Sequence, residues 1–147
     1  MLYFSQATRP DRVRETFELL REGRVAVAMS RAVLSEIRDV LAREEYRDEF
    51  PALTDEAVAA FLREVLGLTR MIRKVPHVYT VERDPKDSKY VDLAAAAGAS
   101  YLVTRDRDLL DLMKHTTRQG REFRRRFRKL IILEPGDFCR EITVGRA

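Results

Sequence analysis

The sequence contains few of the features that would place this protein in a disulfide-rich or membrane class. Its 147 residues include one cysteine, Cys139, which excludes an internal disulfide framework and a cysteine-based zinc site. No apolar run approaches the roughly 18 residues of a membrane span, and the N-terminus lacks the basic lead of a secretory signal. We therefore expect a soluble, cytoplasmic protein that has no membrane partner.

Histidine is nearly as scarce, and the motifs of several enzyme classes are missing. The two histidines, His77 and His115, lie far apart, and neither has a serine or cysteine nucleophile elbow beside it. There is no Walker loop, and no G-x-G-x-x-G pattern follows an expected strand. We interpret both histidines as surface or core residues, and we expect no catalytic scheme that depends on these motifs.

The length and the charge of the chain set broad limits. A chain of 147 residues is typical of one domain, and we expect a single domain over residues 1–147. Such a chain buries roughly two thirds of its unfolded surface, so it needs no disulfide or metal to fold. Lysine and arginine number 28 against 24 aspartates and glutamates, and the charge of +4 permits a polyanionic partner without requiring one.

Helical and strand patterns alternate along the chain. Helical spacing of apolar residues begins at Pro10 and again after the expected caps Ser30 and Thr54, and an alanine-rich helix ends at Gly98. Apolar runs predict strands at residues 24–29, 101–103 and 130–133, an edge segment at residues 75–81, and the end of a further strand at residues 1–7. This order indicates an α/β fold in which crossover helices join parallel strands.

Two aspartates stand directly after the strand expected at residues 101–103. Asp106 and Asp108 alternate there with Arg105 and Arg107. Ligands of open α/β sheets collect at the carboxyl ends of the strands. We therefore interpret this stretch as the mouth of a site.

Two further acids are candidates for the same site. Glu36 lies one helical turn from Val33 and Val40, at the edge of a buried stripe, although it could also be a marginal residue that pairs with a neighbouring arginine. Asp87 precedes the alanine-rich helix and could be an ordinary helix cap. Because parallel strands and the helices that follow them open on one edge, both acids could converge with Asp106.

Convergent carboxylates favour a metal site. Like charges within a few ångströms repel, so such a cluster needs a cation or shared protons, and hard oxygen ligands suit Mg²⁺ or Mn²⁺. An ion held there can activate water for attack on a phosphodiester and neutralise the charge of the transition state. The acids therefore indicate metal-dependent phosphodiester hydrolysis.

Positive charge is concentrated between residues 114 and 129, where Glu122 is the single acid. Phe123 and Phe127 would anchor a short helix with its arginines facing outward. Arginine donors suit phosphate, whereas a solvated charged face is the alternative. The candidate RNA-binding residues are Arg105, Arg107, Arg124, Arg125 and Arg128.

Two stretches of the sequence resemble a known family. Residues 75–90 read VPHVYTVERDPKDSKY, and residues 97–110 read AGASYLVTRDRDLL. In order and spacing they are similar to the PIN domains of VapC-like toxins from toxin–antitoxin pairs, and the similarity extends through residues 23–41 and 127–138. The resemblance implies a three-layer α/β/α sandwich with a parallel central sheet, a Mg²⁺- or Mn²⁺-dependent ribonuclease site, a homodimer and an antitoxin protein as partner.

The resemblance also implies the residues of the site. The helix acid of the family falls on Glu36, and the acid that opens the alanine-rich helix falls on Asp87. The acid after the strand falls on Asp106, with Asp108 as its usual neighbour. These four acids would bind the metal, and Thr104 would support the site through its hydroxyl.

One departure from the family pattern concerns the start of the chain. The family begins with a strand that ends in an aspartate, the first site carboxylate, whereas residues 1–4 resemble the segment that comes just after that strand. No acid precedes Asp11, which is a poor substitute because it falls in the first turn of a helix. We expect that the first strand is missing, either because the start was assigned too late, because the beginning was lost, or because this is a degraded copy. Since its neighbours in the sheet would then lack a partner and the site a carboxylate, we expect weak metal binding and poor RNA cleavage.

Two functions from different classes remain at this stage. The first is a metal-dependent ribonuclease, whose activity would disappear in EDTA and on Asp106→Asn. The second is a catalytically inactive PIN-like module that binds RNA or a protein partner through residues 121–129.

Overall fold

The structure is a computed structural model that describes the backbone of residues 10–145 and the side chains of residues 15–145. The strand end predicted at residues 1–7 lies outside the described residues, and so does the side chain of Asp11. Helices and short parallel strands alternate along the described chain, so the predicted α/β class is confirmed.

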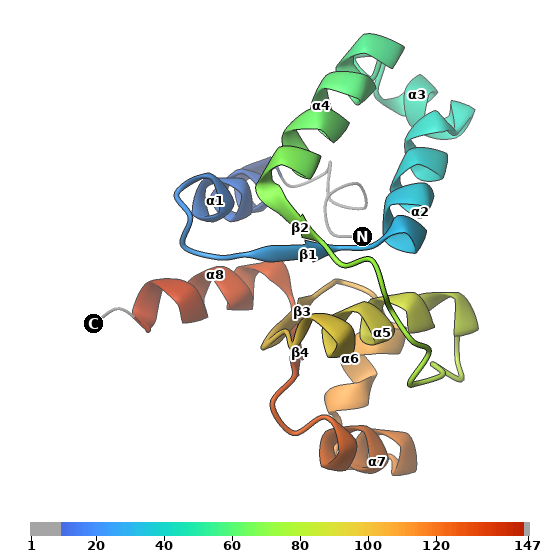
Figure 1. Cartoon of the computed structure of the whole chain (residues 1–147), viewed down its shortest axis with the longest axis vertical. Coiled ribbons are helices and arrows are strands. Elements are labelled where there is room, and N and C mark those ends of the chain that lie inside the picture. The colour runs from blue at the N-terminus through green and yellow to red at the C-terminus, as the bar shows by residue number, and fades with distance from the viewer. Residues whose placement is uncertain (1–9, 146–147) are drawn as a thin grey trace.

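The described strands form two separate sheets, each of two strands. β1 (Val27–Met29) pairs in parallel with β2 (Thr69–Met71), and β3 (Tyr101–Val103) pairs in parallel with β4 (Ile131–Leu133). The parallel pairing agrees with the prediction, whereas the four described strands are not joined into a single sheet. Figure 1 shows β1 and β2 on one side of the molecule and β3 and β4 on the other.

Helices surround both sheets (Figure 1). The helical elements are α1 (Pro10–Arg21), α2 (Arg31–Ala42), α3 (Glu44–Glu49), α4 (Asp55–Leu68), η1 (Pro85–Asp87), α5 (Ser88–Ala97), α6 (Arg107–Leu110), η2 (Asp111–Met113), α7 (Arg118–Arg126) and α8 (Pro135–Val144). In this view α1 to α4 lie on one side of β1, and the remaining helices lie on the other side.

The expected helix ends are present. The Ser30 hydroxyl accepts the Val33 N–H at 3.2 Å and begins α2, and the Thr54 hydroxyl accepts the Ala57 N–H at 3.1 Å and begins α4. Gly98 ends α5 with a φ of 62°, a left-handed conformation that glycine adopts without steric cost. These three helix ends were predictable because each depends on one residue type at one position.

The edge segment predicted at residues 75–81 does not form a strand. The Asp92 carboxylate of α5 accepts the N–H groups of Val78 at 2.8 Å and Tyr79 at 3.1 Å, and the Ser88 hydroxyl accepts the Val81 N–H at 2.9 Å. Side chains of α5 therefore take the hydrogen bonds that a neighbouring strand would have taken.

The prediction also missed β2 and made β1 too long. β2 begins at the residue after α4 ends, with no turn residue between them to signal the change. The predicted strand at residues 24–29 is reduced to Val27–Met29.

Helix α5 packs on strands of both sheets. It contacts both β1 and β3, and its residues Tyr90, Val91, Leu93 and Ala94 belong to the main apolar core. Its alanines allow this close packing because a small side chain lets a helix approach a sheet. The packing of α5 on the core therefore fixes the position of Asp87, which stands at the N-cap of this helix.

A substitution at Asp92 tests how residues 75–81 are held. Asp92→Ala should lower the free energy of unfolding by about 2–3 kcal/mol, because it leaves the N–H groups of Val78 and Tyr79 without a partner. Asp39→Ala, an exposed aspartate of α2, should change it by less than about 0.5 kcal/mol. Urea unfolding of both variants measures the difference, and equal small effects would show that Asp92 does not hold this segment.

Candidate metal site at the start of helix α5

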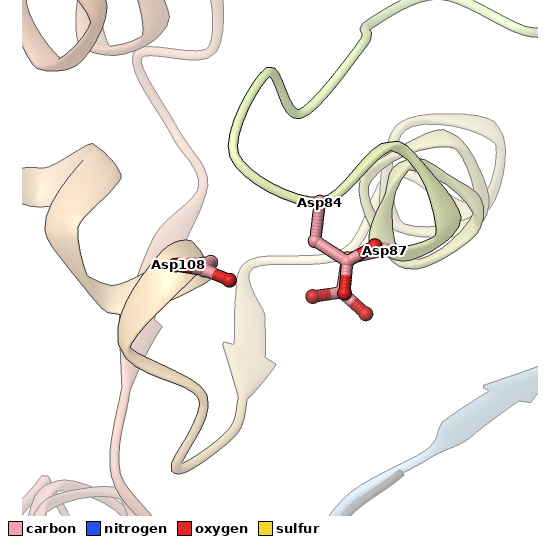
Figure 2. A group of neighbouring side chains, drawn as sticks. All are labelled: Asp84, Asp87 and Asp108. Atoms are coloured by element: carbon pink, nitrogen blue, oxygen red, sulfur yellow. The ribbon is translucent and has the colours of Figure 1, made fainter.

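Three carboxylates meet beside the start of α5. One oxygen from each of Asp84, Asp87 and Asp108 lies within 4.8 Å of the others. Figure 2 shows Asp84 and Asp87 together at the turn before α5, with Asp108 on α6 facing them. The three side chains thus come from two segments that are distant in sequence.

The turn of η1 places Asp84 and Asp87. The Asp84 carboxylate accepts the Lys86 N–H at 3.2 Å and begins this turn, and Pro85 favours its first position. Asp87 stands at the N-cap of α5, but its side chain accepts no capping hydrogen bond. Its carboxyl group is buried, and its Oδ2 atom has no hydrogen-bond partner within the described part of the chain.

The surroundings of Asp87 favour its protonated form. Burial raises the pKa of Asp87 to about 7, and a hydrogen bond shared with Asp106 and the charge of Asp106 act in the same direction. The charges of Asp84 and Glu36 add smaller contributions of the same sign. Asp87 therefore keeps its proton at pH values at which an isolated aspartate is ionised.

A short chain of hydrogen bonds places Asp106 and Asp108 after β3. The buried Thr104 hydroxyl accepts the Asp106 N–H at 3.0 Å, and the Asp106 carboxylate accepts the Asp108 N–H at 2.8 Å. Asp106 thereby caps α6 and stays exposed, while Asp108 is turned toward Asp84 and Asp87.

Basic side chains balance part of this negative charge. The Nε atom of Arg83 lies 3.0 Å from an Asp108 oxygen, and its Nη1 atom lies 2.5 Å from Asp111. Hydrogen bonds from Lys114 and Arg83 lower the pKa of Asp111. Asp108 is therefore held from one side by a cation that belongs to the same chain.

Glu36 of α2 is held by two residues of α5. The Tyr90 hydroxyl donates a hydrogen bond to Glu36, and the Lys89 ammonium lies 3.2 Å from the same carboxylate. Burial and the bond to Glu36 raise the pKa of Tyr90, so the phenol keeps the proton that it donates. Glu36 is close enough to influence Asp87, but it is not one of the three acids within 4.8 Å.

The structure gathers most of the residues predicted from the sequence and adds one. Asp87 and Asp108 are in the close group, Asp106 interacts with Asp87, and Glu36, which Tyr90 and Lys89 hold, influences Asp87 through its charge. Asp84, which begins the turn of η1, was not among the residues predicted for the site. Its position three residues before Asp87 was the signal that could have found it.

A comparison with protein families matches this chain to a family model described as PIN domain over residues 2–108. The chain belongs to the PIN domain family. No curated protein and no solved structure matches it. The matched residues include α5 and the strand β3, with Asp108 as the last matched position, and β4 and α8 follow the match but pack on β3.

Two properties of PIN domains agree with the site. PIN domains are generally nucleases, and they typically bind divalent metals. The acidic group of this PIN domain consists of hard oxygen donors, which are the ligands that such metals take. Among residues 10–145 no helix is long and apolar enough to cross a membrane.

The arginines predicted to contact RNA lie in two places of the PIN domain. Arg105 and Arg107 flank Asp106 at the site, whereas Arg124, Arg125 and Arg128 are exposed on or just after α7. Arg124 is anchored by the Met113 carbonyl at 3.1 Å and by His115 at 2.8 Å. The buried Phe123 fixes α7 to the core, so its arginines face outward as expected.

The pKa of Asp87 predicts how the metal-free stability depends on pH. Unfolded aspartate titrates near pH 4 and folded Asp87 near pH 7, so in this window the folded state alone keeps the proton. The contribution of Asp87 to the free energy of unfolding is fully present below pH 4 and is lost as pH rises to about 7. In EDTA, the stability of the wild type relative to Asp87→Asn should fall by about 2 kcal/mol between pH 5 and pH 8.

Urea unfolding at the two pH values measures this difference. Asp39→Asn is the matched control, and it should follow the wild type at both pH values because Asp39 is exposed. If the difference between the wild type and Asp87→Asn stays constant from pH 5 to pH 8, Asp87 is ionised throughout and its burial has no such effect.

Proposed function

We propose that this PIN domain is a Mg²⁺- or Mn²⁺-dependent endoribonuclease. The observation that supports it most is the meeting of Asp84, Asp87 and Asp108, whose oxygens lie within 4.8 Å of one another. Membership of a family of nucleases makes a phosphodiester the substrate class that fits this site. The outward-facing arginines of α7 and of residues 105–107 provide cations for the RNA backbone.

The residues present fit a divalent cation. The buried Oδ2 atom of Asp87 is an acceptor that no described donor reaches, and a cation would satisfy it. Asp84, Asp87 and Asp108 would hold the ion, with Asp106 beside Asp87 and Glu36 facing them. A bound ion would supply an activated water and balance the charge that builds on the phosphate.

Asp87 decides at which pH this site can act. Below about pH 7 it keeps its proton, and a protonated carboxyl group is a poor metal ligand. Above that pH its carboxylate is available to a metal ion. The proposed activity therefore increases with pH until Asp87 has lost its proton.

Tyr90, Lys89 and Arg83 act as positioning residues in this proposal. The Tyr90 hydroxyl and the Lys89 ammonium hold Glu36, and Arg83 holds Asp108. These contacts fix Glu36 and Asp108. The Oδ2 atom of Asp87 has no hydrogen-bond partner among the described residues. They also reduce the repulsion between the acids when no other cation is present.

We further propose that the nuclease is the toxin of a toxin–antitoxin pair. The likeness of residues 75–90 and 97–110 to VapC-like toxins supports this role, and it brings with it an antitoxin protein as partner, a homodimer and the three-layer sandwich of that family. The proposed substrate is cellular RNA in the cytoplasm.

Two aspartate substitutions test the proposed reaction. Asp106→Asn and Asp87→Asn should each lower the rate of cleavage of single-stranded RNA by at least about 100-fold, because each removes a carboxylate from the site. EDTA should abolish cleavage and added Mn²⁺ should restore it. Asp137→Asn, an exposed aspartate that pairs with Arg140 on α8, is the matched control and should retain activity. Cleavage that survives EDTA and both substitutions would contradict the proposal.

A second candidate function is an inactive PIN domain that binds RNA. The pairing of Glu36 with Lys89 and of Asp108 with Arg83 favours it, because acids already balanced by the chain have less need of a metal. The exposed arginines of α7 would then be the main functional surface. This candidate predicts RNA binding that is sensitive to salt and indifferent to EDTA.

Substitution of the arginines measures their part in either function. The triple variant Arg124→Gln, Arg125→Gln, Arg128→Gln should weaken RNA binding and reduce the slope of log affinity against log salt concentration by about 2, since each contact with single-stranded RNA contributes about 0.7. The control is the triple variant Arg38→Gln, Arg63→Gln, Arg73→Gln, which replaces exposed arginines of α2, of α4 and of the segment after β2. It should bind RNA as the wild type does. Equal salt slopes for all three proteins would exclude α7 as an RNA contact.

A further inference from the structure

Arg83 lies between the acidic group and η2, and two carboxylates hold its guanidinium. Its Nε atom lies 3.0 Å from the Asp108 carboxylate, and its Nη1 atom lies 2.5 Å from that of Asp111. Asp108 belongs to the acidic group, whereas Asp111 is the first residue of η2. The two contacts therefore fix the orientation of the guanidinium beside the site.

One side of this guanidinium remains available. Within the described residues its Nη2 atom has no hydrogen-bond or ion-pair partner, and the side chain of Arg83 is 51% exposed. A guanidinium carries its N–H donors in a planar fork, and those on Nη2 are suited to a phosphate oxygen. Because Asp108 and Asp111 already restrict the side chain, it loses little conformational freedom when it binds a ligand.

The surroundings of Arg83 connect the acidic group with α7. Glu82, the residue before Arg83, accepts a hydrogen bond from the Gln119 side chain of α7. Helix α7 also packs against η2. The Lys114 ammonium, just after η2, lies 2.9 Å from Asp111, the acid that also holds Arg83. Arg83 and Lys114 thus stand between the acidic group and the exposed arginines of α7.

The charges around Arg83 select the kind of ligand. Asp108 and Asp111 repel a free phosphate ion that approaches the guanidinium. A chain of phosphates overcomes this repulsion, because its neighbouring phosphates bind other cations at the same time. Lys114 and the arginines of α7 are exposed and provide such cations. The position of Arg83 therefore suits a polyanionic strand and not a single small anion.

We propose that Arg83 binds a backbone phosphate of single-stranded RNA through Nη2, so that the strand runs from the acidic group to α7. This inference deepens the proposed function, because it names a substrate contact of the same site, and it rests on RNA as the substrate. It does not depend on the metal ion, since Arg83 binds the strand whether or not cleavage follows.

The salt dependence of RNA binding in EDTA tests this contact on the full chain. Arg83→Gln should weaken the binding of a short single-stranded RNA by about tenfold and reduce the slope of log affinity against log salt concentration by about 0.7. Arg83→Lys retains the charge and should restore the slope. The matched control is Arg21→Gln, which removes an arginine that is 53% exposed and pairs with Glu64. It should bind RNA as the wild type does.

The side-chain Nε–H signal of Arg83 in an NMR spectrum of the wild type provides the second measurement. Titration with the RNA should shift this signal, whereas inorganic phosphate at the same phosphate concentration should not. An unchanged signal with RNA, or an equal shift with inorganic phosphate, would overturn the proposal. An unchanged salt slope in Arg83→Gln would overturn it as well.

Cleavage of the same RNA in Mn²⁺ separates this proposal from the proposed nuclease activity. Contact of RNA with Arg83 in a protein that does not cleave would contradict the nuclease and support the contact. Cleavage by a protein whose Arg83 signal ignores RNA would support the nuclease and overturn the contact. A wild type that binds no RNA would overturn both.

Discussion

The burial of the Asp87 carboxyl group at the start of α5 is the constraint on which the site depends. Helix α5 contacts both β1 and β3, and Asp87 stands at its N-cap. A charged group buried there is unfavourable unless a proton or a cation accompanies it. The same packing that builds the core therefore creates the demand for a ligand at Asp87.

The surrounding basic residues balance the charge of some of the acids but not of Asp87. Arg83 pairs with Asp108, and Lys89 and Tyr90 hold Glu36. The negative charges of Asp108 and Glu36 are therefore balanced by basic side chains of the same chain. Within the described residues Asp87 has no basic partner of this kind, and its burial and its hydrogen bond with Asp106 favour its protonated form. Metal binding at this site therefore depends on pH through Asp87, because a metal ion would have to replace the proton of Asp87, whereas Asp108 and Glu36 are held by salt bridges.

The sequence predicted the features that depend on local chemistry and on the family pattern. Ser30, Thr54 and Gly98 specify helix ends by themselves, and the order of strands and helices indicates an α/β fold with parallel pairing. The loss of the strand at residues 75–81 could not be predicted, because it depends on the contact of Asp92 with residues 14 positions away. Asp84 stands three residues before Asp87, but its closeness to Asp108 arises from tertiary packing and could not be predicted either.

The most direct test of this account is a calorimetric titration of the protein with Mn²⁺ at pH 6 and pH 8. The wild type should bind at pH 8 and about tenfold more weakly at pH 6, because Asp87 must first lose its proton. Asp87→Asn should bind much more weakly at pH 8 and show little change with pH, while the exposed control Asp39→Asn should bind as the wild type does. Equal binding by Asp87→Asn and the wild type at both pH values would contradict the account.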